Sequence, residues 1–254
     1  TVTLDSAGSP ANVVSTLSTG TITIDANGAT SDIVVNDGIS TASGNITLDA
    51  DNDITFAAEG DITSTSGNVA ITADKDNGGA SSGLLTMNDG TLINAGSGTI
   101  LLSADQDITL GGLLTTNTGN TAVTLTSTEG GIVDGGATTV DVVATGGRLV
   151  IDSVTGVGVA GAIDTTVASL DLDNATSGNV DLAETNAITV VKAVQATTGN
   201  IQIASAGGTV TLDSAGSPAN VVSTLSTGTI TIDANGATSD IVVNDGISTA
   251  SGNI

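Results

Sequence analysis

The chain has 254 residues, of which three are lysine or arginine and 27 are aspartate or glutamate, so its formal net charge is −24. It contains no histidine, cysteine, tryptophan or tyrosine, and Phe56 is its single aromatic residue. This composition excludes disulfide scaffolds, thiolate metal sites and nucleophiles activated by histidine. It also argues against nucleic acid as a partner, because binding phosphate requires lysine and arginine. No run of about 18 apolar residues occurs, so we expect no membrane insertion of this segment.

The sequence repeats itself over a long period. Residues 209–254 are identical to residues 1–46, which gives a period of 208 residues. We expect one full repeat at 1–208 and the start of the next at 209–254, in a continuous structure with no domain boundary between them. Neither end resembles a polar cap, so we also expect the array to extend beyond this window.

A shorter unit, Gly-x-Φ-x-Φ with Φ an aliphatic residue, recurs inside the long period. It occurs at Gly20, Gly44, Gly67, Gly98, Gly147, Gly178 and Gly199, and near Gly119 its aliphatic positions slip to Val123 and Leu125. Successive units lie 21 to 31 residues apart. Their alternation with period two predicts β-strands that have one buried and one exposed face.

The segments between these units predict further short strands. In residues 44–66, three strand-like stretches follow one another, each introduced by Gly, Asp or Asn. Three strands in 23 residues make one coil of a solenoid, and stacked coils place their aliphatic residues above one another. The sequence therefore predicts an all-β parallel solenoid with about 21–31 residues per coil and no significant helix. Residues 10–17 are the best candidate for a helical turn, but we predict a loop there.

Two stretches, SGNITLDADNDITFAAEGDITSTSGNVAITAD (43–74) and GVGVAGAIDTTVASLDLDNATSGNVDLAETNAITV (156–190), carry a family resemblance. They resemble the repeats of filamentous-haemagglutinin-type adhesins and of the giant repetitive surface proteins of bacteria, and the resemblance extends over the whole chain. It implies a right-handed parallel β-helix, secretion, and a rod that carries or constitutes an adhesin. It implies no catalytic residue.

Recurring aspartates give one candidate metal site. An aspartate follows the strand unit at a constant offset in Asp25, Asp49, Asp152 and Asp213, and Asp5 occupies the equivalent place at the start of the chain. If Asp5, Asp25 and Asp49 stack on successive coils, their carboxylates lie about 5 Å apart and can recruit Ca²⁺. The alternative is that each aspartate hydrogen-bonds its own turn. No other cofactor is expected.

Three further motifs lack the context that their functions need. Residues 156–161 read Gly-x-Gly-x-x-Gly, but a strand-like run follows where a dinucleotide site needs a helix, so we interpret these glycines as a tight corner. Residues 49–60 begin like an EF-hand loop, but Ile54 and Gly60 stand where glycine and glutamate are required. Thr-x-Thr pairs are typical of ice-binding faces, but they are interrupted along the chain, and outward threonine is favoured on any strand.

An enzyme is the remote alternative, because polysaccharide lyases and pectinases share the β-helix fold. Their chemistry needs a basic residue beside clustered carboxylates, and inverting hydrolases need a carboxylate pair. Lys75, Arg148 and Lys192 are widely separated in sequence. We therefore expect that the chain is not an enzyme.

These observations favour a rigid, acidic, extracellular or cell-surface rod with a structural or adhesive function. The expected partners are neighbouring repeats or further copies of the chain, end to end or side by side, and surface glycans are a further candidate. The main alternative is a ligand-binding module that makes glycan or Ca²⁺-bridged contacts on a repeat face.

Overall fold

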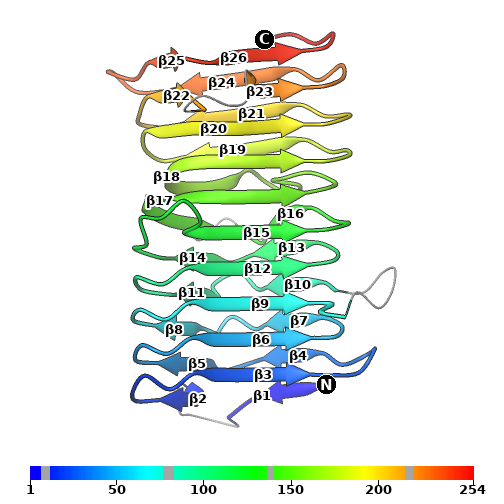
Figure 1. Ribbon diagram of the computed structural model, residues 1–254, viewed down its shortest axis with the longest axis vertical. Coiled ribbons are helices and arrows are strands. Elements are labelled where there is room, and N and C mark those ends of the chain that lie inside the picture. The colour runs from blue at the N-terminus through cyan, green and yellow to red at the C-terminus, as the bar shows by residue number, and fades with distance from the viewer. Residues whose placement is uncertain (7–11, 77–82, 137–139, 215–219) are drawn as a thin grey trace.

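The computed structural model describes residues 1–6, 12–76, 83–136, 140–214 and 220–254. In these ranges all regular structure is β-strand, and there is accordingly no helix that could cross a membrane. The strands stack in chain order along one long axis, from the N-terminus at one end to the C-terminus at the other (Figure 1). Every strand pairing is parallel, which confirms the predicted β-solenoid.

Each coil of the N-terminal half presents three sides. The first side contains β1 (Val2–Leu4), β4 (Ile33–Val35), β7 (Ile54–Phe56), β10 (Leu85–Met87), β13 (Ile108–Leu110) and β16 (Ile132–Asp134). The second side contains β2 (Asn12–Thr16), β5 (Gly38–Thr41), β8 (Ile62–Ser64), β11 (Leu92–Asn94) and β14 (Gly112–Leu114). The third side contains β3 (Ile22–Ala26), β6 (Ile46–Ala50), β9 (Val69–Ala73), β12 (Ile100–Ala104) and β15 (Val123–Ser127).

Longer strands follow in the C-terminal half. The strands β17 (Val142–Ser153) and β18 (Ile163–Asn174) each extend over both the second and the third side. The remaining strands are β19 (Val180–Glu184), β20 (Ile188–Gln195), β21 (Ile201–Ser205), β22 (Val210–Leu212), β23 (Asn220–Thr224), β24 (Ile230–Ala234), β25 (Ile241–Val243) and β26 (Gly246–Thr249). The strands β22 to β26 have the bounds of β1 to β5 displaced by 208 residues, so the two identical segments form the same strands.

The core consists of ladders of inward aliphatic side chains, one residue from each coil. The Val2 ladder contains Val2, Ile33, Ile54, Leu85, Ile108, Ile132, Val157, Val180, Ile201 and Ile230. The Ile22 ladder contains Ile22, Ile46, Val69, Ile100, Val123, Leu149, Leu170, Val190, Leu212 and Val243. Phe56 is fully buried between Val35 and Met87, so the one aromatic ring is a core residue. Stacking like residues keeps the core of uniform width, which explains why small aliphatic residues suffice.

One inner ladder changes from aliphatic to polar along the solenoid. On the second side it contains Val14, Ile39, Ile62, Ile93, Leu113, Val142, Thr165, Glu184 and Ser205. The carboxylate of Glu184 is buried, and it accepts hydrogen bonds from Thr165 Oγ1 at 2.7 Å and from the backbone N–H of Val167 at 3.1 Å. Burial raises the pKa of Glu184, and these hydrogen bonds oppose that shift.

The glycine of the strand unit is required by close backbone stacking. A Cβ atom at Gly44 would lie 1.9 Å from the carbonyl oxygen of Gly20, and one at Gly67 would lie 1.8 Å from that of Gly44. The same conflict recurs between Gly178, Gly199 and Gly228. A carbonyl of one coil therefore packs where the next coil would carry a side chain, and only glycine fits.

Polar side chains form hydrogen bonds with the backbone at the glycine corners. The hydroxyl groups of Thr41 and Ser64 accept hydrogen bonds from the N–H groups of Gly44 at 3.0 Å and Gly67 at 2.8 Å. Asparagines beside the glycines connect successive coils, because Asn45 Oδ1 accepts a bond from the Asn68 N–H at 2.9 Å. These bonds satisfy backbone donors that leave the sheet at the corner.

Several local predictions are confirmed and one is wrong. Residues 44–66 contain β6, β7 and β8, as the pattern predicts, and β18 follows the glycine corner at 156–161. Val123 and Leu125 pair with Ile100 and Leu102, which confirms the slip near Gly119. The loop predicted at 10–17 is wrong, because β2 occupies Asn12–Thr16 and pairs with β5; residues 10 and 11 lie outside the described residues.

Replacing Gly67 with alanine should destabilise the solenoid by about 3 kcal/mol, because the new Cβ would meet a backbone carbonyl that cannot move without breaking the ladder. Gly20→Ala is the matched control, because its nearest contact is the Thr16 side chain at 3.3 Å, and it should cost less than about 1 kcal/mol. Equilibrium denaturation with urea measures both. Equal losses would contradict the steric explanation.

Candidate functional site

All three basic side chains of the chain pair with aspartates. Lys75 Nζ lies 3.0 Å from Asp25 Oδ2, and Arg148 Nη1 lies 3.9 Å from Asp171 Oδ2. Lys192 forms an ion pair with Asp173. Arg148 and Lys192 belong to β17 and β20, the strands on either side of β18, whereas Lys75 follows β9. Two of the three basic residues, although distant in sequence, therefore share one charged surface.

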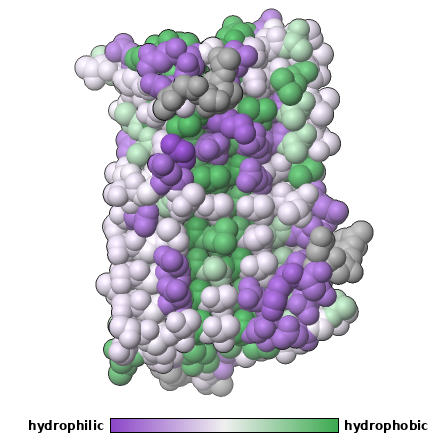
Figure 2. Space-filling model, in the orientation of Figure 1, coloured by the Kyte–Doolittle hydropathy of each residue, from purple (hydrophilic) through white to green (hydrophobic). Residues whose placement is uncertain are grey.

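The aspartates of two of these ion pairs, Asp25 and Asp173, lie on one outward ladder of the third side. The Asp25 ladder contains Asp25, Asp49, Thr72, Ser103, Thr126, Asp152, Asp173 and Val194. Aspartates therefore stack in two pairs, and neighbouring strands lie about 4.8 Å apart. Each pair has one lysine beside it. Figure 2 shows polar patches on either side of an apolar strip along the face it displays.

A lysine affects one carboxylate of each stacked pair. The hydrogen bond from Lys75 lowers the pKa of Asp25. In the second pair, burial and the adjacent charge of Asp173 raise the pKa of Asp152, and the charge of Lys192 acts in the opposite sense. In both pairs a lysine ammonium offsets the repulsion between two like charges.

The structure separates the three aspartates of the calcium hypothesis. Asp25 and Asp49 pair in register, but Asp5 follows β1, which belongs to the other sheet, and there Asn36 Nδ2 donates to Asp5 Oδ2 at 3.4 Å. Lys75 Nζ lies 3.0 Å from both carboxylate oxygens of Asp25, so a positive charge already accompanies this carboxylate. Among the described residues, no three acidic side chains are close enough to hold a metal ion. Calcium binding by Asp5, Asp25 and Asp49 stays a prediction.

Other aspartates have a structural function that sequence reasoning missed. Asp53, Asp61 and Asp107 each accept a hydrogen bond of 2.8 Å from a backbone N–H of the next coil, donated by Leu84, Leu92 and Gly131 respectively. The signal was present in the sequence, because each of these aspartates opens an Asp-Ile-Thr triplet. Much of the acidic composition therefore connects coils instead of binding a ligand.

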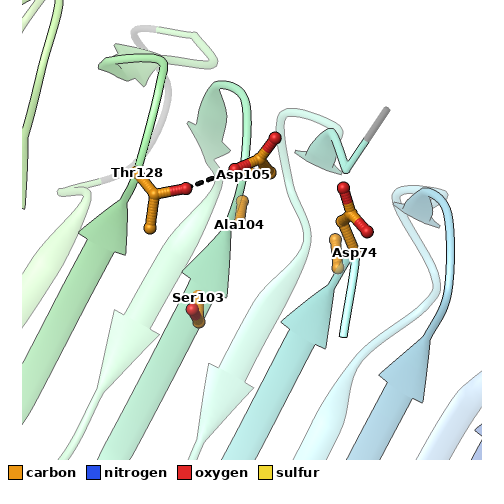
Figure 3. A pocket seen from close by; sticks show the side chains of 6 residues that line it. Asp74, Ser103, Ala104, Asp105 and Thr128 are labelled. Carbon is orange, nitrogen blue, oxygen red and sulfur yellow. Dashed lines mark hydrogen bonds between the residues drawn. The ribbon is translucent and has the colours of Figure 1, made fainter. Parts of the chain in front are cut away.

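A shallow depression lies where the third side ends (Figure 3). It has a volume of about 130 Å³ and is lined by Ala73, Asp74, Ser103, Ala104, Asp105 and Thr128. The Thr128 hydroxyl donates to the Asp105 carboxylate. Ligand pockets usually measure roughly 300–1,000 Å³, so this depression is too small for a sugar ring. The recurring Ala-Asp dipeptide at the end of β9 and β12 is the sequence signal for it.

Asp141 is the most strongly perturbed carboxyl group. It is 1 % exposed, its Oδ2 accepts a hydrogen bond of 2.8 Å from the Asp164 N–H, and its Oδ1 has no hydrogen-bond partner. Burial, together with the charges of Asp134, Asp164 and Asp89, raises the pKa of Asp141 to about 7. No basic side chain described in the structure pairs with it.

No protein-family model, curated protein or solved structure matches the chain. The resemblance to bacterial adhesin repeats therefore rests on the repeat pattern alone, whereas the solenoid fold stands on its own geometry.

Replacing Lys75 with glutamine should strengthen calcium binding, because it frees the stacked Asp25 and Asp49 from their ammonium partner. The measurement is the rise in melting temperature between chelator and millimolar Ca²⁺, which should be larger for Lys75→Gln than for the unaltered chain. Adding Asp49→Asn should abolish the gain, and adding Asp5→Asn should not. A melting temperature independent of calcium in every chain would contradict the calcium hypothesis.

Replacing Asp141 with asparagine should stabilise the protein increasingly as the pH rises. The pKa of Asp141 is raised in the folded chain, so its contribution to stability is present at low pH and is lost as the pH rises from about 4 to about 7. The gain should be small at pH 4 and on the order of 2–4 kcal/mol at pH 8. Denaturation at both values measures it, with the exposed Asp240→Asn as a control for the loss of one negative charge. A gain that is the same at both pH values would contradict the burial argument.

Proposed function

We propose that the chain is a length of an extracellular, cell-surface rod whose function is structural or adhesive. The observation that carries this proposal is the unbroken Val2 ladder, which extends through all the coils from β1 to β24. A ladder of this kind has no natural stopping point, so the number of sequence repeats sets the length of the rod.

Surface chemistry supports the same proposal. The net charge of −24 makes neighbouring rods repel one another and keeps the rod soluble. Lysine and arginine, where trypsin cleaves, number only three, and all three are held in ion pairs. Such a surface suits a fibre that persists outside the cell.

A binding function on a repeat face is the second candidate. It is favoured by the charged surface around β18, where Arg148 pairs with Asp171 and Lys192 pairs with Asp173, which stacks on Asp152. Carboxylates and basic groups on one surface can hydrogen-bond the hydroxyl groups of a glycan, and the carboxylates can connect neighbouring rods through Ca²⁺. Loss of glycan or cell binding in Arg148→Ala/Lys192→Ala would identify this face as the adhesive one.

An enzymatic function has less support. The charged surface around β18 lies on a sheet face, and the carboxylates nearest the basic residues already form ion pairs with them. The depression at Asp105 lacks both a basic side chain and the room for a sugar. We therefore keep a polysaccharide-active enzyme as a remote alternative only.

The rod proposal predicts how the shape changes with copy number. Chains of one, two and three tandem 208-residue copies should lengthen by about 40 Å per copy, because each copy adds between eight and nine coils at about 4.8 Å. Small-angle X-ray scattering should show this linear growth at a constant cross-sectional radius. A radius that increases with copy number would indicate copies that fold back or collapse together, and would contradict the proposal.

A further inference from the structure

The two identical segments, residues 1–46 and 209–254, belong to different ladders of the solenoid. Val210 is the copy of Val2, yet the Val2 ladder passes through Ile201 and Ile230 and omits Val210. Ile230 is instead the copy of Ile22. A residue of the first side in one copy is therefore continued by a residue of the third side in the next.

In the Ile22 ladder, residues of the third side are continued by copies of residues from the first side. It passes through Val190 and ends on Leu212 and Val243, which are copies of Leu4 and Val35 from the first side. Two independent ladders thus agree that strands β22 to β26 occupy other sides of the solenoid than β1 to β5.

The internal geometry of the two copies is nevertheless the same. Thr16 Oγ1 donates to Thr41 Oγ1 at 2.8 Å, and their copies Thr224 and Thr249 are 2.9 Å apart. The Ser6 N–H donates to Asp37 Oδ2 at 2.6 Å, and the equivalent bond from Ser214 to Asp245 measures 2.7 Å. The second copy is therefore a repositioned duplicate of the first, and its own pairing is intact.

The change of side takes place between two consecutive strand units. The unit at Gly147 places Leu149 in the Ile22 ladder, whereas the unit at Gly178 places Val180 in the Val2 ladder. The strand units therefore do not all stack in one column. The long strands β17 and β18 span two sides here, and their pairing has a register shift between Ala144 and Arg148. The number of residues in the corners of this region differs from that in the other coils. The 208-residue period is therefore not a whole number of coils.

We infer that successive copies of the repeat are rotated about the solenoid axis, so that equivalent outward side chains of neighbouring copies face different sides of the rod. A contact surface on one copy, for a glycan or for a second rod, is then presented on another side by the next copy. A multi-copy rod accordingly has no single face that carries the same side chains throughout. This inference concerns the register and stands whether or not the proposed function is correct.

Cysteine cross-linking tests the inference directly, because the chain contains no cysteine of its own. Four outward positions serve: Thr189, Gln202, Thr211 and Thr231. Thr189 pairs with Thr211, and Gln202 pairs with Thr231. If the repeat instead matched a whole number of coils, Thr211, the copy of Thr3, would lie on the first side beside Gln202. Thr231, the copy of Thr23, would then lie on the third side beside Lys192 and away from Gln202.

Four double variants combine these positions. The rotated register predicts rapid intramolecular cross-linking by a short bis-thiol reagent in Thr189→Cys/Thr211→Cys and in Gln202→Cys/Thr231→Cys. It predicts at least tenfold slower cross-linking in Thr189→Cys/Thr231→Cys and Gln202→Cys/Thr211→Cys. Mass spectrometry identifies the linked peptides, and circular dichroism checks that each variant folds. Cross-linking that is rapid in Gln202→Cys/Thr211→Cys and slow in Gln202→Cys/Thr231→Cys, or equal rates in all four variants, would overturn the inference. A rod of separate globular units, which would refute the proposed function, is detected independently by scattering.

Discussion

The in-register parallel stacking of coils is the constraint on which the rest of the structure depends. Because each strand hydrogen-bonds to the coil above and the coil below, every position must tolerate its counterpart about 4.8 Å away. Aliphatic residues meet this condition and form the core. Gly44 and Gly67 meet it where a carbonyl of the preceding coil leaves no space for Cβ. Asn45 satisfies the condition because its side-chain amide oxygen accepts a hydrogen bond from the backbone N–H of Asn68 in the next coil.

Charged side chains tolerate this stacking least well, because like charges on successive coils repel each other. This repulsion explains why the lysines lie beside stacked aspartates. Stacking places Asp25 on Asp49 and Asp152 on Asp173, and each pair has a lysine beside it. Where the acids point at a corner, as Asp53 does, they accept backbone hydrogen bonds from the adjacent coil instead. Acidic residues are therefore part of the solenoid's connections, and a metal or substrate is not needed to explain their number.

The sequence was sufficient to predict the fold class, the period and the inward positions, because these depend on alternation and spacing along the chain. It could not predict which strand lies above which. That depends on how many residues each corner consumes, and the register shift between Ala144 and Arg148 has no signal in a hydropathy pattern. For the same reason Asp5 was grouped with Asp25, although it lies on another side. The strand β2 was missed because its valines follow a proline and resemble a loop.

The central claim is that one continuous ladder connects the copies of the repeat. Electron cryomicroscopy of a chain with three tandem copies tests it most directly. We expect unbroken layers about 4.8 Å apart through each junction, with the density at Ile230 directly above that at Ile201. A gap, a hinge or a separate globular unit at each 208-residue junction would contradict it.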